Sequence, residues 1–182
     1  MKVYAGVGSR ETPPEILLMM SRISRKLTYQ GWGLRSGGAD GADNAFLEGA
    51  LQANNVKETP IEIYLPWEDY NGKGNEWYCV DVSKLPNHHD AFDIASHFHP
   101  VWNRLKEPVK ALHTRNVYQI LGRDLKTYSS RLICWAKPIK DGERVRGGTA
   151  TAVAMARHFG IPVMNLYFEE EQKKALKFIN GD

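Results

Sequence analysis

A glycine-containing stretch, residues 35–43, constrains the fold of this chain more than any other feature. It follows an aromatic and apolar run from Tyr29 to Leu34 that is typical of a strand, and it leads into a helical pattern over residues 44–51. A strand, a glycine turn and a helix in this order direct free backbone N–H groups at an anion. Gly37 and Gly38 have no Cβ, so the turn tolerates positive φ and close approach by a ligand. An ordinary strand-to-helix turn has the same pattern, and both interpretations stay open.

Polar side chains surround these two glycines. Ser36 adds a hydroxyl directly before them. Asp40 and Asp43 are placed either to cap the following helix or to accept hydrogen bonds from a sugar.

Two further glycine turns have the same relation to predicted strands. Residues 6–10 end the first predicted strand, residues 2–7, and place Gly8, Ser9 and Arg10 at its carboxyl end. The helix after this turn has the start signals of a capping box, with Thr12 as N-cap and Pro13 as the first helical residue.

The third turn, residues 146–151, follows the fourth predicted strand, residues 131–136, and opens a helix. Its candidate ligand-binding residues are Gly147, Gly148, Thr149 and Thr151.

Strands that alternate with helices along the whole chain predict an α/β fold. Further strands are expected over residues 61–65 and 161–166, and further helices over residues 91–105, 107–122 and 169–179. The pattern predicts a Rossmann-like three-layer sandwich, with a mostly parallel sheet of about five or more strands and helices on both faces. The 182 residues are expected to form a single domain, with an insertion at about residues 68–106. The three glycine turns fall at the carboxyl ends of strands, where such sheets bind ligands, and together predict one crevice for a phosphate-bearing ligand.

Composition limits the class of protein only loosely. The formal net charge of +3 tolerates an anionic ligand but is too small to establish nucleic-acid binding. The two cysteines lie far apart, no secretory signal is visible, and no apolar run is long enough for a bilayer. These features predict a cytoplasmic protein with no membrane partner.

Three other patterns bear on function. Four histidines, His88, His89, His97 and His99, lack a ligand pattern with Cys or carboxylates, so no metal site is expected and an interfacial or loop role is favoured. No cofactor is expected. Trp67 follows the third strand and either stacks on a base or packs against a loop. The basic residues Lys137, Lys140, Arg144 and Arg146 either form a solvated surface or steer a polyanion.

The three turns, together with Arg115-Asn116 on the helix before the fourth strand, occur in an order that resembles one known superfamily. This is the Rossmann-like nucleotide-binding superfamily (SLOG) of DNA-processing protein A (DprA/Smf) and the LOG phosphoribohydrolases. The first two motifs are most similar to the DprA branch. The resemblance implies that Ser9, Arg10 and Arg115 contact phosphate and that Asp40 lies near a sugar or base. It also implies that the glycine turns supply N–H groups, and that the protein forms homo-oligomers.

The chain departs from the LOG pattern in the residues that perform catalysis. LOG enzymes carry a catalytic Glu after the last glycine turn, whereas residues 149–154 here contain no carboxylate. Glycosidic cleavage needs an acid or base there, so Asp40, Asp43 or Glu11 would have to replace it. Two hypotheses follow. The chain either binds a nucleotide, a nucleotide-derived signal or single-stranded DNA, or it hydrolyses or transfers at an N-glycosidic bond of a nucleotide.

Overall fold

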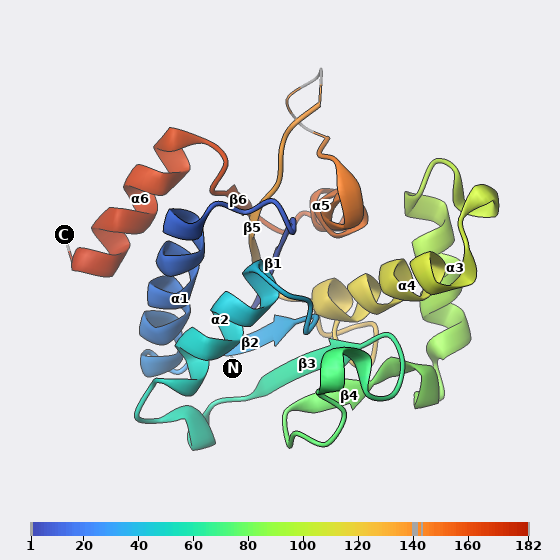
Figure 1. Ribbon diagram of the computed structural model, residues 1–182, viewed down its shortest axis with the longest axis horizontal. Helices are drawn as coiled ribbons and strands as arrows, with labels where there is room; N and C mark the ends of the chain where they lie inside the picture. Colours follow the sequence, from blue (N-terminus) through green and yellow to red (C-terminus); the bar gives the residue numbers. More distant parts are fainter. Residues whose placement is uncertain (1, 140–141, 143, 182) are drawn as a thin grey trace.

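The computed structural model describes residues 2–139, 142 and 144–181 (Figure 1). In this part of the chain the strands are β1 (Val3–Gly8), β2 (Gly33–Ser36), β3 (Ile61–Leu65), β4 (Cys79–Asp81), β5 (Arg131–Trp135) and β6 (Val163–Asn165). The α-helices are α1 (Pro14–Tyr29), α2 (Ala42–Leu51), α3 (His88–Phe98), α4 (Glu107–Leu121), α5 (Ala150–His158) and α6 (Glu169–Asn180).

The strands form one six-stranded parallel sheet in the order β4-β3-β2-β1-β5-β6. In the register of its centre, Ala5 of β1 pairs with Arg35 of β2 and with Leu132 of β5. The chain adds β2, β3 and β4 on one side of β1 and then returns to add β5 and β6 on the other. The order therefore reverses between β1 and β5, and such a reversal is where open α/β sheets bind ligands.

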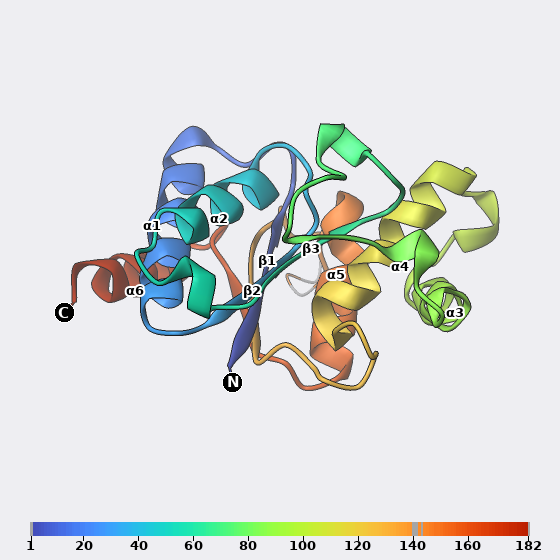
Figure 2. The ribbon, with the colours of Figure 1, turned by 90° about the horizontal axis from the view of Figure 1, so that it is seen from below.

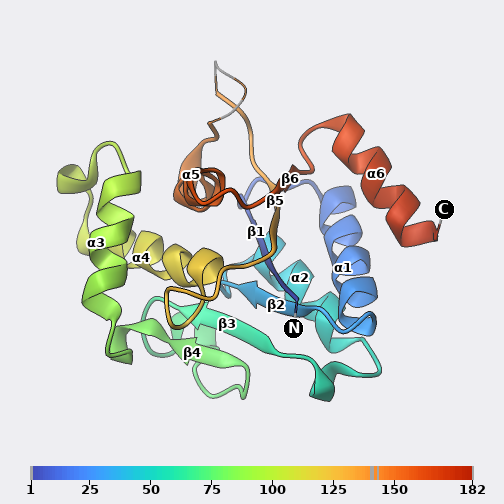
Figure 3. The same cartoon turned by 180° about the vertical axis from the view of Figure 1, so that it is seen from behind.

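Helices cover both faces of this sheet, which confirms the predicted α/β class. Helices α1, α2 and α6 lie on one face, and α3, α4 and α5 lie on the other (Figures 1 and 2). Each face has its own apolar core, with Phe46 and Met20 fully buried in the first and Tyr118 and Leu132 fully buried in the second. Seen from behind, β4 and β6 lie at opposite edges of the sheet (Figure 3).

The second predicted strand was wrong at its start. Tyr29 ends α1, and Gly31, with φ of 81°, turns the chain toward β2. Leu27 and Thr28 are buried because the apolar stripe of α1 continues to its last turn. Strand β2 is therefore displaced toward Ser36, so Arg35 and Ser36 belong to the sheet and not to the turn.

The predicted N-cap of the first helix was also wrong. Pro13 occupies the N-cap position and α1 begins at Pro14. The Thr12 hydroxyl instead donates a hydrogen bond to the carbonyl oxygen of Ser9, 2.6 Å away. The first helical hydrogen bond runs from the Leu17 N–H to the carbonyl oxygen of Pro13 (3.0 Å), so the helix starts one residue later than a Thr12 cap requires.

Residues 68–106, the segment expected to be an insertion, pack into the same fold. Helix α3 packs against α4 through Ala91 and Ala95, which are fully buried, and it begins three residues before the predicted start and ends at Phe98. Strand β4, three residues long at the sheet edge, was not predicted. Within the described ranges, none of the helices combines the length and apolar character that crossing a membrane requires.

Candidate functional site

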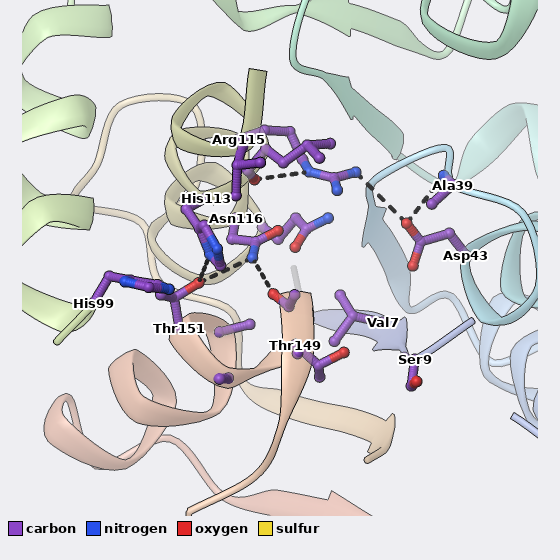
Figure 4. A pocket seen from close by; sticks show the side chains of 18 of the residues that line it. Val7, Ser9, Ala39, Asp43, His99, His113, Arg115, Asn116, Thr149 and Thr151 are labelled. Carbon is purple, nitrogen blue, oxygen red and sulfur yellow. Dashed lines mark hydrogen bonds and ion pairs between the residues drawn. The ribbon is translucent and has the colours of Figure 1, made fainter. Parts of the chain in front are cut away.

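A cavity of about 640 Å³ opens at the carboxyl end of β1 (Figure 4). Its wall is formed by the turn after β1, the start of α2, one side of α4, the start of α5, and two segments of the insertion. This volume lies within the range of pockets that bind small organic ligands. The predicted residues that line it are Gly8, Ser9, Arg10, Asp43, Arg115, Asn116, Gly147, Gly148, Thr149 and Thr151.

The turn after β1 brings a free cation to this cavity. The Ser9 N–H donates to the carbonyl oxygen of Trp135 on β5 (3.0 Å), and the Ser9 hydroxyl oxygen accepts from the N–H of Glu11 (3.1 Å). These bonds hold the turn in place. Arg10 is exposed, and its side chain has neither an ion pair nor a hydrogen bond to any other described residue. Its charge is therefore available to an anion.

The start of α5 lies across the cavity from this turn. Residues Gly147–Thr149 form a short 3-10 turn that runs directly into the helix. Gly147 has φ of 77°, and both Gly147 and Gly148 are exposed with open space where a Cβ would be. The first N–H groups of a helix have no acceptor within it, and the helix dipole makes this end positive.

Buried polar residues of α4 fix the geometry of the α5 start (Figure 4). The Asn116 amide nitrogen donates to the carbonyl oxygen of Gly148 (2.7 Å) and to the hydroxyl of Thr151 (3.0 Å). His113 Nδ1 lies 2.9 Å from the same hydroxyl. That hydroxyl accepts from Asn116, and it can donate its own proton to His113 Nδ1 in the tautomer in which that nitrogen carries no proton.

His113 is held in its neutral form. Burial, together with the neighbouring His99 and Arg115, lowers the pKa of His113 to about 4. The rings of His99 and His113 lie with their centroids 4.6 Å apart. At neutral pH His113 therefore adds no charge to this side of the cavity.

Arg115 makes a buried ion pair with Asp43, one of the three candidate catalytic carboxylates. Arg115 Nη1 lies 3.6 Å from Asp43 Oδ2 and also donates to the carbonyl oxygen of Gly37. The N–H of Ala39 donates to Asp43 Oδ2 (3.1 Å). Burial raises the pKa of the Asp43 carboxyl, and the Arg115 guanidinium and the Ala39 N–H oppose that rise.

The glycine turn predicted to be the main anion site lies behind this pair. Ser36 is fully buried and its hydroxyl donates to the carbonyl oxygen of Gly6 (2.6 Å). Gly37 and Gly38 are buried, and none of these three residues lines the cavity. A Cβ at Gly37 would lie 1.6 Å from Arg115 Nη1, so the missing side chain makes room for Arg115.

The remaining candidates lie outside the cavity. Asp40 is exposed, and its Oδ1 accepts from the Asn44 amide (3.2 Å). Glu11 is exposed and pairs with Lys137 (3.0 Å). Trp67 is 38% exposed and packs edge-on against Tyr70, with centroids 5.1 Å apart, so it packs against its own loop. Of the four predicted basic residues near this edge, Lys140 lies outside the described residues.

Sequence reasoning missed about half of the cavity wall. The insertion contributes Tyr70, Phe98, His99 and Pro100, and α4 contributes Val109, Leu112, His113 and Gln119. The α4 residues share one helix face with Arg115 and Asn116, so their spacing was a usable signal. No such signal connects the insertion to the glycine turns.

Among the described residues, no group of three or more His, Cys, Asp or Glu side chains could hold a metal ion. The described lining includes a single carboxylate, Asp43, and it is already paired.

No protein-family model matches this chain, and neither does any curated protein. Two solved structures of the molybdenum cofactor carrier protein from Chlamydomonas reinhardtii are similar to it, with TM-scores of 0.52 and 0.53. They are 18% and 17% identical, and each comparison covers 100% of this chain and 86% or 87% of the other. At this level of identity, the chain shares with the molybdenum cofactor carrier protein a parallel α/β fold.

Proposed function

We propose that this chain binds a phosphorylated small molecule, a nucleotide or nucleotide-derived compound, in the cavity at the carboxyl end of β1. The main observation behind the proposal is that two glycine turns line the same cavity. Residues 8–10 and 147–149 come from opposite ends of the chain, and both line it.

The chemistry of these two turns suits a phosphate group. Arg10 brings a positive charge with no other partner in the described chain. The 3-10 turn that leads into α5 brings the first N–H groups of this helical segment, which have no acceptor within it, and the positive end of the helix dipole. A charge-assisted hydrogen bond from an arginine to phosphate is stronger than a neutral one.

Another part of the cavity wall suits a ring. Phe98, Pro100, Val109 and Leu112 line it with apolar surface, and neutral His113 lies beside them. A ligand with an anionic end and a flat, mostly apolar end matches this division. A nucleotide has both parts, and the molybdenum cofactor carrier protein, by its name, carries a cofactor on a similar fold.

Binding without chemistry is favoured over N-glycosidic cleavage. Cleavage needs a free acid or base near the anomeric carbon. Asp43 is paired with Arg115, and Asp40 and Glu11 lie outside the cavity. On its motifs we place the chain nearest the DprA branch of the superfamily that it resembles, and we expect it to self-associate.

A thermal-shift panel at two salt concentrations tests this function. The ligands are nucleoside mono-, di- and triphosphates, NAD, ADP-ribose and a short oligothymidine. A ligand at one hundred times its Kd adds about 2.7 kcal/mol of stability. A shift from a mononucleotide that resists added salt supports the proposal. A shift from the oligonucleotide alone, lost at higher salt, would replace it with single-stranded DNA binding.

A further inference from the structure

The carboxamide of Asn116 has one fixed orientation in the cavity wall. Its nitrogen lies 2.7 Å from the carbonyl oxygen of Gly148 and 3.0 Å from the hydroxyl of Thr151, both at the start of α5 (Figure 4). A backbone carbonyl oxygen only accepts hydrogen bonds, so the carboxamide atom beside Gly148 must be the nitrogen. These two partners use both amide hydrogens. The carboxamide oxygen, Oδ1, is therefore directed away from them.

This oxygen is an acceptor that no described residue uses. Asn116 is 5% exposed and lines the cavity. Its Oδ1 makes no hydrogen bond within the described chain, yet it is not one of the unpaired side-chain atoms that this part of the chain encloses completely. Oδ1 therefore keeps accessible surface, and this surface opens into the cavity that Asn116 lines. A ligand that displaces water from this oxygen must supply a hydrogen-bond donor in its place.

The partner of this oxygen cannot be a phosphate group. Phosphate oxygens are strong hydrogen-bond acceptors, and Asn116 Oδ1 is also only an acceptor. Both amide hydrogens of Asn116, which could have contacted an anion, are already donated to α5. Asn116 must therefore meet a part of the ligand that carries an O–H or N–H group.

The position of Asn116 indicates which part of a nucleotide this is. On one side, its carboxamide bonds directly to Gly148, in the turn proposed for phosphate. On the other side, Leu112 lies about one helical turn earlier on α4 and belongs to the apolar wall proposed for the ring. Asn116 thus lies between the two proposed subsites. In a nucleotide the sugar joins the phosphate to the ring, and its hydroxyl groups are hydrogen-bond donors.

We infer that Asn116 Oδ1 accepts a hydrogen bond from a sugar hydroxyl of the ligand and so selects a ribonucleotide over its deoxy form. This inference rests on the proposed function and narrows the ligand to a nucleotide with a free 2′- or 3′-hydroxyl. A site that hydrogen-bonds a hydroxyl discriminates strongly against the analogue that lacks it, because the protein atom is then left unpaired. Internal nucleotides of DNA have no free hydroxyl at either position, so the same contact disfavours DNA.

Matched nucleotides that differ by one hydroxyl test the inference. Adenosine and guanosine 5′-monophosphates would be compared with their 2′-deoxy and 3′-deoxy forms, and each Kd would be measured by calorimetry for the wild type, Asn116→Ala and Asn116→Asp. We expect the wild type to bind a ribonucleotide at least tenfold more tightly than one of its two deoxy forms. In Asn116→Ala, which has no acceptor at this position, that ratio should fall to within twofold.

Asn116→Asp separates the proposed contact from the structural role of Asn116. Aspartate keeps an acceptor oxygen but has no amide hydrogens for Gly148 and Thr151. It should therefore bind every nucleotide more weakly, because the start of α5 loses its anchor, and still prefer the ribonucleotide by tenfold or more. Both members of a pair carry the same phosphate, so damage to the α5 turn cancels in their ratio. Thermal unfolding establishes that each variant is folded. If Asn116→Ala does not fold, the ratio in Asn116→Asp decides the test.

The remaining outcomes separate this inference from the proposed function. Equal Kd values for the ribonucleotides and all of their deoxy forms in the wild type would overturn the inference alone. The same is true of a ratio that stays at tenfold in Asn116→Ala or that disappears in Asn116→Asp. Absence of binding by every nucleotide would overturn the proposed function, and the inference with it.

Discussion

Arg115 Nη1 lies 3.6 Å from Asp43 Oδ2, and this buried pair joins α4 to the start of α2. Both side chains are more than nine-tenths buried. Removing one member of a buried pair leaves the other charge without compensation, which costs about 3–5 kcal/mol. The pair therefore links the part of the cavity wall that α4 forms to the part that the start of α2 forms.

The first prediction concerns this ion pair. Arg115→Met and Asp43→Asn should each lower the free energy of unfolding, by about 3 kcal/mol or more for Arg115→Met. The double variant should lose clearly less free energy of unfolding than the two single variants lose together, because no buried charge is then left without a partner. Urea denaturation of the four proteins measures this coupling. Additivity to within about 0.5 kcal/mol would show that the two side chains do not interact.

The second prediction concerns the space at Gly37. Gly37→Ala should lower the free energy of unfolding by about 1–3 kcal/mol or more, because its Cβ would lie 1.6 Å from Arg115 Nη1. Gly148→Ala is the matched control, since nothing lies within 4 Å of a Cβ there. The free energy of unfolding of Gly148→Ala should stay within about 0.5 kcal/mol of that of the wild type. Equal stability of the two variants would contradict the packing described for Arg115.

The third prediction concerns pH. His113 is neutral in the folded protein above about pH 4, whereas in the unfolded chain it takes up a proton near pH 6.5. Between these values the unfolded state binds more protons, so the free energy of unfolding falls as pH drops from about 6.5 to about 4. His113 accounts for roughly 3 kcal/mol of this loss.

His113→Asn should flatten that part of the pH profile, because Asn has an acceptor near the position of Nδ1 but does not titrate. His97→Asn, at an exposed position that does not line the cavity, is the control for the substitution itself. Denaturant titrations from pH 4 to 7 measure the three slopes. The same slope in wild type and His113→Asn would mean that His113 takes up its proton at the same pH in the folded and unfolded states.

The fourth prediction concerns Asp40. Its side chain is exposed and accepts from Asn44 outside the cavity, so Asp40→Asn should change the Kd of a bound nucleotide less than twofold. Neither protein should release free base from that nucleotide over hours, as measured by chromatography. Base release by the wild type that is lost in Asp40→Asn would instead establish the glycosidase hypothesis.

The fold could be predicted because its signals are local. Strand β3 is an apolar run between Pro60 and Pro66, β5 is a second apolar run, and helix α4 has an apolar stripe that ends at Gly122. Strand β4 could not be found in this way, since three partly buried residues at a sheet edge leave no periodicity. The start of β2 was misplaced because Tyr29 is compatible with both a helix end and a strand start.

The cavity could be predicted only in part. Residues 8–10 and 147–149 were found because each follows a strand and contains glycine. Tyr70 and His99 were missed because their place in the wall depends on how the insertion packs on α4, and this is a long-range contact. The turn at Gly37 was assigned to a ligand, whereas the structure fills its free space with Arg115.

A calorimetric titration of an exposed arginine variant tests the proposed function most directly. The best nucleotide from the panel would be titrated into the wild type, Arg10→Ala and Arg25→Ala. Arg25 is also exposed but lies on α1, away from the cavity. Loss of a charge-assisted bond to phosphate should weaken nucleotide binding by Arg10→Ala by about 2 kcal/mol, or roughly thirtyfold in Kd. The Kd of Arg25→Ala should equal that of the wild type. Unchanged affinity in Arg10→Ala would contradict a phosphate site between the turn after β1 and the start of α5.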